Sequence, residues 1–431
     1  MEDVPEPPIN PNFDDFDDYE LDQTSDLHDD GDDEDQTSDL HADDERKIKN
    51  FMKDLPSRVS FRRPKSKYHL WSFWSEPTLS LRSGSSITDS ATHTPTTNQP
   101  IITDIIKSAL LHFNDSFLMV EVLLIQFWAP MTTETGCVQL VTSDQPFALS
   151  YHLDEGLLEY RKQCLQYKFN VDGDGEGVEG LGIAGRVFRQ KWPELIQDVG
   201  HYSTKEYPQR DFALACHILS CCSFPVFQTS FQECVGVLEF ATTTDSFLHT
   251  ASYLFMKHAL KSAGLKTSWC DALICKILYK DDHPNIWAEI EEGLEVVCKT
   301  HDLPLAKTWI RCRHFNGLAF DGNLDNSCDT FDVSCMGPAF HCDFLTFNLL
   351  DHNMKVFFYH WSDFQNRQEV VRSAYQSHKL CLCRDLTQFS ITEYPSLPLA
   401  RAFGLRGCFA IYLQNTRAKN FHYVLEFFSE S

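Results

Sequence analysis

One segment of the sequence is written twice, 187 residues apart. Asp198 to Pro208 reads DVGHYSTKEYP, and Asp385 to Pro395 reads DLTQFSITEYP. Other residues keep the same offset: Ala213 and Ala215 fall on Ala400 and Ala402, and the VLEF string Val237 to Phe240 falls on Val424 to Phe427. Separate segments in one register are hard to obtain by chance, so the chain is predicted to contain two copies of one structural unit.

Hydrophobic spacing predicts an α/β (α+β) unit with a central, mostly antiparallel sheet flanked by helices. We place the first copy at residues 101–265 and the second at 266–431. The elements expected in the first copy are helices Ile101–Phe113, Leu157–Gln166, Ala184–Gln190 and Leu248–Ala263, and strands Phe117–Trp128, Cys137–Thr142, Cys222–Phe227 and Cys234–Ala241. Those expected in the second are helices Ile286–Thr300 and Gln368–Ser377, and strands Leu305–Cys312, Lys355–His360, Cys408–Leu413 and Tyr423–Phe428.

The net charge of -25 is concentrated at the N-terminus. Residues 1–45 contain 20 Asp or Glu and no Lys or Arg, whereas the other 386 residues have 42 acids and 37 bases, a balance of -5. Like charges repel and few apolar groups offset the chain entropy, so residues 1–67 are predicted to be a disordered tail, acidic and then basic. The nearly neutral body lacks a field that attracts phosphate backbones, so we expect no direct contact with nucleic acid.

The acidic tail has two interpretations. Phe13, Phe16 and Tyr19 stand isolated among acids, a composition typical of activation segments that bind a coactivator groove. The same composition fits an inert solubilising tail.

A short basic cluster follows the acidic tail. Its residues, of the kind read by nuclear import receptors, are Arg62, Arg63, Lys65 and Lys67. Residues 68–100 are expected to be a linker that contains an aromatic docking segment, Leu70–Trp74, before a Ser/Thr-rich stretch. The start of the chain is acidic rather than signal-like, so the 16 cysteines are expected to be reduced thiols of a cytosolic or nuclear protein. No run of about 18 apolar residues predicts a membrane span.

A glycine-rich turn distinguishes the two copies. Gly180–Gly185 reads GLGIAG, and the offset places it against Arg367–Arg372, which reads RQEVVR. Glycines such as Gly182 and Gly185 let the backbone approach a ligand closely and then enter a helix whose amides face an anion. They also suit a tight turn with no ligand, so both interpretations stay open.

The sequence carries no complete catalytic or metal-binding motif. Asp172–Ile183 starts like a calcium loop but ends in Ile183 instead of a bidentate glutamate, so we predict a flexible surface loop. No two CxxC pairs can build a zinc site, and GLGIAG matches a dinucleotide fingerprint only in letters. No motif brings a nucleophile, a base and an oxyanion group together, so we expect no enzyme and no cofactor.

Several strings, in order, resemble the GAF-like region of the plant NIN-like proteins. They are FWAP at Phe127–Pro130, SDQPF at Ser143–Phe147, GIAGRVF at Gly182–Phe188, EYP at Glu206–Pro208 and CVGVLEF at Cys234–Phe240. The resemblance covers about residues 68–431, including Asp385–Pro395. It implies two tandem GAF-like domains, the second degenerate, in a nuclear regulator of nitrate-responsive transcription that shuttles with the cytoplasm.

The same resemblance implies what the chain binds and what it lacks. Family members continue into RWP-RK and PB1 domains, and no Arg-Trp-Pro-x-Arg-Lys string occurs here. We therefore expect either an incomplete member or one that regulates others, in both cases without DNA binding by this chain. The implied ligand is nitrate or another small anion. Tyr394 carries over as a pocket residue, and Arg367 or Arg372 would have to offset Asp363 and Glu369.

The expected partners and the alternative function complete the predictions from sequence. The partners are other transcription regulators or coactivators, or a second subunit in a homo- or hetero-dimer. A GAF-like module that binds a different small molecule, or that only dimerises, is the alternative. The family's regulatory serine aligns with Cys221, so phosphorylation at that point is expected to be lost.

Overall fold

The structure is a computed structural model. It describes residues 34–76, 99–116, 122–172, 178–191, 193–196, 198–228, 233–244, 250–267, 284–311, 340–346, 369–394, 397–415 and 422–430. The described residues divide into two units after Ile48, and both copies of the repeat lie in the second.

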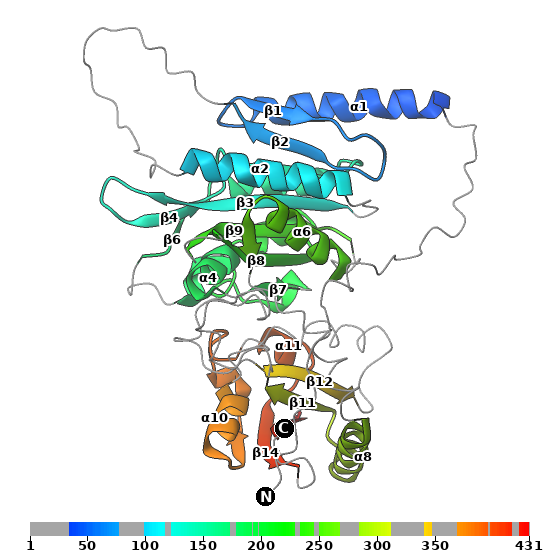
Figure 1. Cartoon of the computed structure of the whole chain (residues 1–431), viewed down its shortest axis with the longest axis vertical. Coiled ribbons are helices and arrows are strands. Elements are labelled where there is room, and N and C mark those ends of the chain that lie inside the picture. The colour runs from blue at the N-terminus through cyan, green and yellow to red at the C-terminus, as the bar shows by residue number, and fades with distance from the viewer. Residues whose placement is uncertain are drawn as a thin grey trace, which may run out of the picture. The chain divides into compact units, whose positions relative to one another are not determined.

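The first copy, here the first domain, is built on an antiparallel sheet (Figure 1). Its central strands lie in the order β5-β3-β9-β8, with β10 beyond β8, and β7 also pairs with β8. The strands are β3 (Leu123–Thr132), β4 (Val138–Val141), β5 (Phe147–Leu149), β6 (Phe169–Asn170), β7 (Glu194–Ile196), β8 (Ser220–Gln228), β9 (Cys234–Thr242) and β10 (Leu265–Thr267). The helices are α2 (Gln99–Ser116), α3 (Glu155–Cys164), α4 (Gly182–Gln190), α5 (Arg210–Ala215) and α6 (Thr250–Ser262), with 3₁₀ turns η2 (Val178–Leu181) and η3 (Val199–His201).

The central sheet of the first domain has one apolar face and one mixed face. Side chains alternate along a strand, so Ile125 and Phe127 of β3 join the apolar core, while Gln126 and Trp128 point to the other side. Helices α2 and α6 cover the apolar face, where side chains at helical spacing such as Ile106 and Phe113 pack on the sheet (Figure 1). The mixed face therefore carries the polar groups that define the candidate site.

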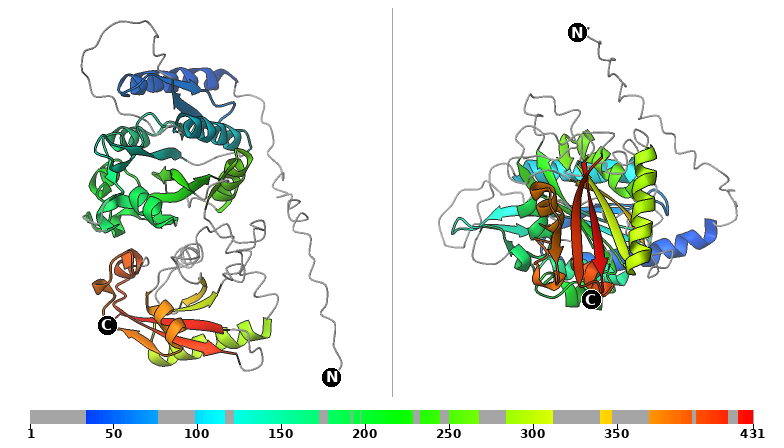
Figure 2. Two further views of the ribbon diagram at one scale, coloured as in Figure 1. Left: turned by 60° about the vertical axis from the view of Figure 1, so that its left-hand side comes forward. Right: turned by 90° about the horizontal axis from the view of Figure 1, so that it is seen from below.

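The second domain repeats this plan with five strands in the order β12-β11-β15-β14-β13. The strands are β11 (Leu305–Arg311), β12 (Phe340–Thr346), β13 (Cys381–Cys383), β14 (Gly407–Gln414) and β15 (His422–Ser429). The helices are α8 (Pro284–His301), α10 (Glu369–Ser377) and α11 (Leu397–Ala402), with the turn η7 (Leu386–Gln388). Figure 2 shows β14 and β15 running side by side with β11, and α8 packs on the outer face of this sheet through Ile290 and Leu294.

The repeat predicted from sequence is confirmed by the bounds of the elements. Adding 187 to both ends of α4, α5, η3 and β7 gives the ends of α10, α11, η7 and β13. Even the caps agree, because Asp198 accepts a hydrogen bond from Gly200 N at 2.7 Å and Asp385 accepts one from Thr387 N at 3.0 Å. The two copies are one fold, as expected.

The N-terminal prediction needs correction between residues 34 and 67. This stretch forms helix α1 (Glu34–Lys53) and strand β1 (Val59–Arg62). The aromatic segment expected to dock, Leu70–Trp74, does so, with Trp71–Trp74 forming most of strand β2 (Trp71–Ser75). β1 pairs with β2, and β2 pairs with β5, where Phe73 stacks on Phe147 with ring centroids 4.5 Å apart. The high net charge of the N-terminal segment pointed to disorder. However, a few apolar side chains such as Phe51 and Trp71 are buried, and their burial offsets the conformational entropy that is lost when the segment folds.

Other predictions differ in detail or cannot be compared. Strand β12 was missed, and the strand expected at Phe117–Trp128 is described from Leu123 onward. The strand expected at Lys355–His360, the Ser/Thr-rich stretch and residues 173–177 of the calcium-like loop lie outside the described residues. Of the helices that the structure describes, none combines the length and apolar character needed to cross a membrane.

Candidate functional site

A glutamate is buried at the centre of the first domain. Glu239 of β9 lies directly opposite Gln126 of β3 on the mixed face and is 3% exposed. Its two oxygens accept hydrogen bonds from Trp128 Nε1, from Gln126 Nε2 at 3.0 Å and from the Tyr160 hydroxyl at 2.7 Å. Burial raises the pKa of Glu239 above its usual range, although these three donors oppose the rise.

A cation and a second tyrosine complete this cluster. Arg161 of α3 donates to Gln126 Oε1 at 2.8 Å and to the Thr142 carbonyl at 2.9 Å, with its guanidinium 4.5 Å from the centre of the Phe147 ring. Burial lowers the pKa of Arg161 to about 10, against the attraction of neighbouring acidic groups. Tyr207, from the EYP motif, exchanges a hydroxyl hydrogen bond of 2.8 Å with Tyr160.

The second domain repeats the buried glutamate. Glu426 of β15 accepts from Trp309 Nε1 at 2.8 Å and from the Tyr394 hydroxyl at 3.0 Å. Lys307, which is 1% exposed, stands opposite Glu426 in the ladder. Burial raises the pKa of Glu426, while the charge of Lys307 and the hydroxyl and indole donors lower it.

These clusters place hydrogen-bonded polar groups on one face of each sheet, although the buried Arg161 Nε has no partner among the described residues. A buried carboxylate with several donors holds strands and helices in one arrangement. Any donor that lost this partner would remain buried without a hydrogen bond, which costs free energy. In the part of the chain that the structure describes, no three His, Cys, Asp or Glu side chains gather to hold a metal ion.

The structure separates the residues expected to bind a ligand. Tyr394 is fully buried and its hydroxyl is taken by Glu426, a carboxylate that would repel an anion at the same place. Arg372 is half-buried on α10, and Arg367 lies outside the described residues. Gly182 and Gly185 belong to the other domain, on α4.

The two glycines have a packing role in α4. Gly182 has a φ of +64°, and a Cβ there would stand 2.9 Å from both Gln209 Oε1 and the Phe169 ring. A Cβ on Gly185 would stand 2.8 Å from Leu181 Cβ. Of the two interpretations left open by the sequence, these contacts favour the tight turn.

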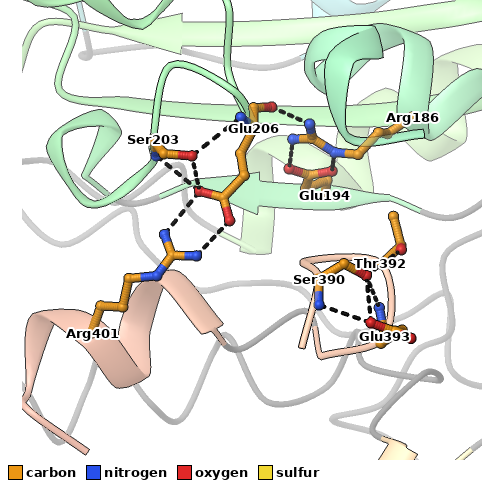
Figure 3. Close-up of polar contacts among 8 residues, drawn as sticks. All are labelled: Arg186, Glu194, Ser203, Glu206, Ser390, Thr392, Glu393 and Arg401. Atoms are coloured by element: carbon orange, nitrogen blue, oxygen red, sulfur yellow. Dashed lines mark hydrogen bonds and ion pairs between the residues drawn. The ribbon is translucent and has the colours of Figure 1, made fainter. Parts of the chain in front are cut away.

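A polar contact links the turn of the first domain to a helix of the second. Arg401 of α11 donates to both carboxylate oxygens of Glu206, at 2.8 and 2.6 Å, and Figure 3 shows the guanidinium facing the carboxylate. Glu206 also accepts from Ser203 N and Ser203 Oγ, each at 2.8 Å, so it closes its own turn. Burial would raise the pKa of Glu206, but the bonds from Arg401 and Ser203 lower it.

The backbone of the same turn is held from the other side. Arg186 of α4 donates to the Glu206 carbonyl and pairs with Glu194, to which its Nε donates at 2.9 Å (Figure 3). The corresponding turn of the second domain is closed in the same way, with Ser390 N and Oγ both 2.8 Å from Glu393. Only the first of these two turns has an arginine from the other domain among the contacts described.

Sequence reasoning missed this contact and the buried clusters. Glu206 belongs to the repeated EYP motif and was therefore singled out. Arg401 was not, because the offset aligns it with Leu214, so the two copies differ at that position. Glu239 and Glu426 were found as repeated letters, and their burial could have been suspected from the apolar strings around them.

The basic cluster is part of a hairpin and not of a tail. Arg62 donates to both oxygens of Asp115 at 3.0 and 2.8 Å, and Lys65 Nζ lies 2.7 Å from the same carboxylate. Arg63, Lys65 and Lys67 are all exposed, and Lys67 Nζ lies 5.3 Å from the centre of the Tyr68 ring. Two of the four basic side chains are therefore bound to the first domain.

Comparison with known proteins finds the same family in both copies of the repeat. The model of the NLP protein GAF domain family matches residues 119–258 and again residues 277–430. Protein NLP6 of Arabidopsis thaliana is 39% identical over 326 residues, which cover 74% of this chain and 38% of that protein. Protein NLP3 of Oryza sativa subsp. japonica is 36% identical over 75% of this chain and 34% of its own length, and protein NLP7 of Arabidopsis thaliana is 36% identical over 78% and 35%.

The chain thus spans little more than a third of the length of these relatives. Among solved structures, the nlh2 GAF domain of A. aeolicus covers 38% of this chain and 88% of its own, at 18% identity and a TM-score of 0.21. The family model covers both copies of the repeat, which is the division that the structure draws. The chain belongs to the NLP, or NIN-like protein, family and contains its GAF region as two domains.

Proposed function

We propose that this chain is the regulatory region of a NIN-like transcription regulator and modulates nitrate-responsive transcription without contacting DNA itself. Its two GAF domains have no catalytic duty in this proposal. They respond to a signal, and the response passes to transcription regulators or coactivators in the nucleus. The observation that carries the proposal is the bidentate contact between Arg401 and Glu206, because it couples the two domains at the repeated turn.

A coupled pair of domains is the arrangement that a regulator needs. The signal must change the free energy of one arrangement of the domains relative to another, and it can do so only through contacts that differ between them. Glu206 closes its turn through two hydrogen bonds from Ser203, which do not involve Arg401. The contact can therefore break and re-form without unfolding either domain.

Nitrate or another small anion is the expected signal, and the buried carboxylates restrict where it binds. An anion next to Glu426 or Glu239 would meet a like charge in a poorly solvated interior. A cation outside these clusters suits an anion better, and we propose Arg372 or Arg401 for that role. An anion that drew Arg401 away from Glu206 would release the contact between the domains.

The proposal is tested with the intact chain expressed in plant cells that carry a nitrate-responsive reporter. We expect reporter output to change when the chain is added, and Arg401→Gln to alter the dependence on nitrate. Glu393→Gln is the matched control, since Glu393 closes the equivalent turn without an arginine among its described contacts. Equal reporter output with and without the chain, at every nitrate concentration, would contradict the regulatory role.

Binding and localisation are tested separately. Nitrate, chloride and sulfate are compared by thermal unfolding of the purified chain, because a ligand bound by the fold raises the midpoint by mass action. A rise with another small molecule but not with nitrate would favour the alternative GAF-like function. For nuclear import, a variant with Gln at Arg62, Arg63, Lys65 and Lys67 is compared with the wild type and is expected to accumulate less in the nucleus.

A further inference from the structure

Two cysteines face each other across the edge of the second domain's sheet. Cys383 of β13 is directly opposite Cys408 of β14, and both are free thiols. In the ladders that the structure describes, no other two cysteines are directly opposite. The neighbouring Cys381 is opposite Ala410 and has no thiol across from it.

The register of this pair suits a covalent bond. Directly opposite residues of an antiparallel ladder have Cα atoms about 4.5–5.5 Å apart and point to the same face. Disulfides span Cα separations of about 4.4–6.8 Å, so the strands need no change of register. β13 has three residues and is the last strand of its sheet, so it can shift slightly to close the remaining gap.

We propose that Cys383 and Cys408 form a reversible cross-strand disulfide when the chain meets a peroxide-class oxidant. This modification site goes beyond the regulatory role proposed above and does not depend on it. Cys383 is the attacking thiol because it is partly exposed, whereas Cys408 is 2% exposed and acts as the resolving thiol. The division of roles follows from access alone.

The chemistry of the pair supports these roles. A hydrogen bond from the Cys408 thiol, with help from the Asp385 backbone amide, lowers the pKa of Cys383 to about 7, against the effect of burial. The same hydrogen bond, together with burial, raises the pKa of Cys408. At neutral pH Cys383 is thus partly thiolate, the nucleophilic form, and Cys408 keeps its proton.

The reaction balances in two steps. The Cys383 thiolate attacks one peroxide oxygen, the O–O bond breaks, and the hydroxide that leaves takes up a proton as water. The Cys408 sulfur then attacks the sulfenic sulfur of Cys383, the S–S bond forms, and a second water leaves with the proton of Cys408. Two thiols lose two electrons, and one peroxide is reduced to two waters.

The position of Cys408 gives the bond a structural consequence. The Cys408 thiol acts as a donor that lowers the pKa of Glu426, the buried carboxylate of the second domain. Oxidation removes that S–H donor and ties the edge strand to β14. The first domain cannot form the equivalent disulfide, because its ladder places Ile196 opposite Cys221.

The experiment uses the full-length reduced chain exposed to hydrogen peroxide, quenched by alkylation, digested without reductant and analysed by mass spectrometry. We expect a cross-linked peptide that joins Cys383 and Cys408 and disappears on treatment with dithiothreitol. Cys381→Ser should leave this peptide unchanged, and Cys383→Ser should abolish it. In Cys408→Ser, dimedone should label Cys383, since the sulfenic acid has no resolving thiol.

The pH dependence supplies a second measurement. The rate of disulfide formation follows the thiolate fraction of Cys383, so it should rise about fivefold between pH 6 and pH 7. A peroxide-treated chain in which Cys383 is linked to Cys381, or in which Cys383 stays reduced, would overturn the proposal. If Cys408→Ser does not fold, Cys383→Ser still decides the question, because it changes a partly exposed edge position.

Discussion

Lys307 occupies in the second domain the place that Gln126 occupies in the first. Each lies directly opposite a buried glutamate, Glu426 or Glu239, in the ladder between the two central strands. In the first domain the cation is Arg161, which reaches the carboxylate through the Gln126 amide. In the second domain the cation is Lys307, which belongs to strand β11 itself. The equivalent buried glutamates of the two domains are therefore paired with cations from different elements.

Two neutral replacements of Lys307 test whether a hydrogen-bonding amide can take the place of the cation. Lys307→Met removes the cation next to Glu426 and should lower the free energy of unfolding by about 3 kcal/mol, because a buried charge loses its partner. Lys307→Gln restores the pairing found in the first domain and should cost less, about 1–2 kcal/mol. Denaturant unfolding of the chain, followed by a tryptophan signal, measures both. Equal losses would show that an amide at position 307 does not compensate for the lost cation.

The pH dependence of stability should reveal the burial of Glu239. Burial raises its pKa above the value of 4.5 in the unfolded chain, despite the donors Tyr160, Trp128 and Gln126. The folded chain therefore binds this proton more readily, so the contribution to stability is full below pH 4.5 and is lost as pH rises through the folded pKa. Relative to Glu239→Gln, the wild type should become less stable between pH 4.5 and pH 8.

The control for this experiment has the opposite sign. The pKa of Glu206 is lowered, so its contribution is present above pH 4.5 and is lost as pH falls through the folded pKa. Relative to Glu206→Gln, the wild type should lose stability on acidification. Two profiles of the same slope would contradict the assignment of one carboxylate to the core and the other to an ion pair.

The repeat made most of the second domain predictable. Hydrophobic spacing predicts helix Gln368–Ser377, whose bounds agree with α10 to within one residue. The duplicated DxxxxSxxEYP string predicts that the two domains have the same turn. What it could not foretell are contacts that depend on tertiary placement. Arg401 stands where the first copy has Leu214, so no comparison of the copies could pair it with Glu206.

The N-terminal error has a different physical cause. The acidic composition of residues 1–45 dominated the interpretation, although a hairpin needs only a few residues of the right alternation and an open sheet edge. Trp71 and Phe73 provide the alternation, and β5 provides the edge. Trp71 Nε1 even finds a partner in the Tyr151 carbonyl at 3.2 Å, a contact 80 residues distant that no local pattern encodes.

The glycine turn can be tested with two alanines two residues apart. Gly182→Ala forces a side chain into the left-handed region and against Phe169, and should cost about 2–3 kcal/mol of stability. Gly180→Ala meets nothing within 4 Å and has no positive φ, so it should change stability by less than about 0.5 kcal/mol. Thermal unfolding of both variants measures the difference. Equal midpoints would show that Gly182 is not required for packing.

The contact between Arg401 and Glu206 should show a measurable coupling energy. Two charge-assisted bonds meet a carboxylate whose side chain is 5% exposed, but the side chain of Arg401 is 34% exposed, so solvent screening reduces the gain. A double-mutant cycle with Arg401→Gln and Glu206→Gln should therefore give about 1–2 kcal/mol. The loss of the turn closed by Ser203 cancels in the cycle, because it occurs with and without Arg401.

The matched cycle combines Arg401→Gln with Glu393→Gln. Glu393 closes the equivalent turn of the second domain through Ser390, and it makes no described contact with Arg401. Its coupling to Arg401 should be near zero, while Arg401→Lys should retain only part of the coupling to Glu206, since an ammonium cannot donate to both oxygens in the same fork. A coupling to Glu393 as large as that to Glu206 would mean that Arg401 acts through general charge and not through this contact.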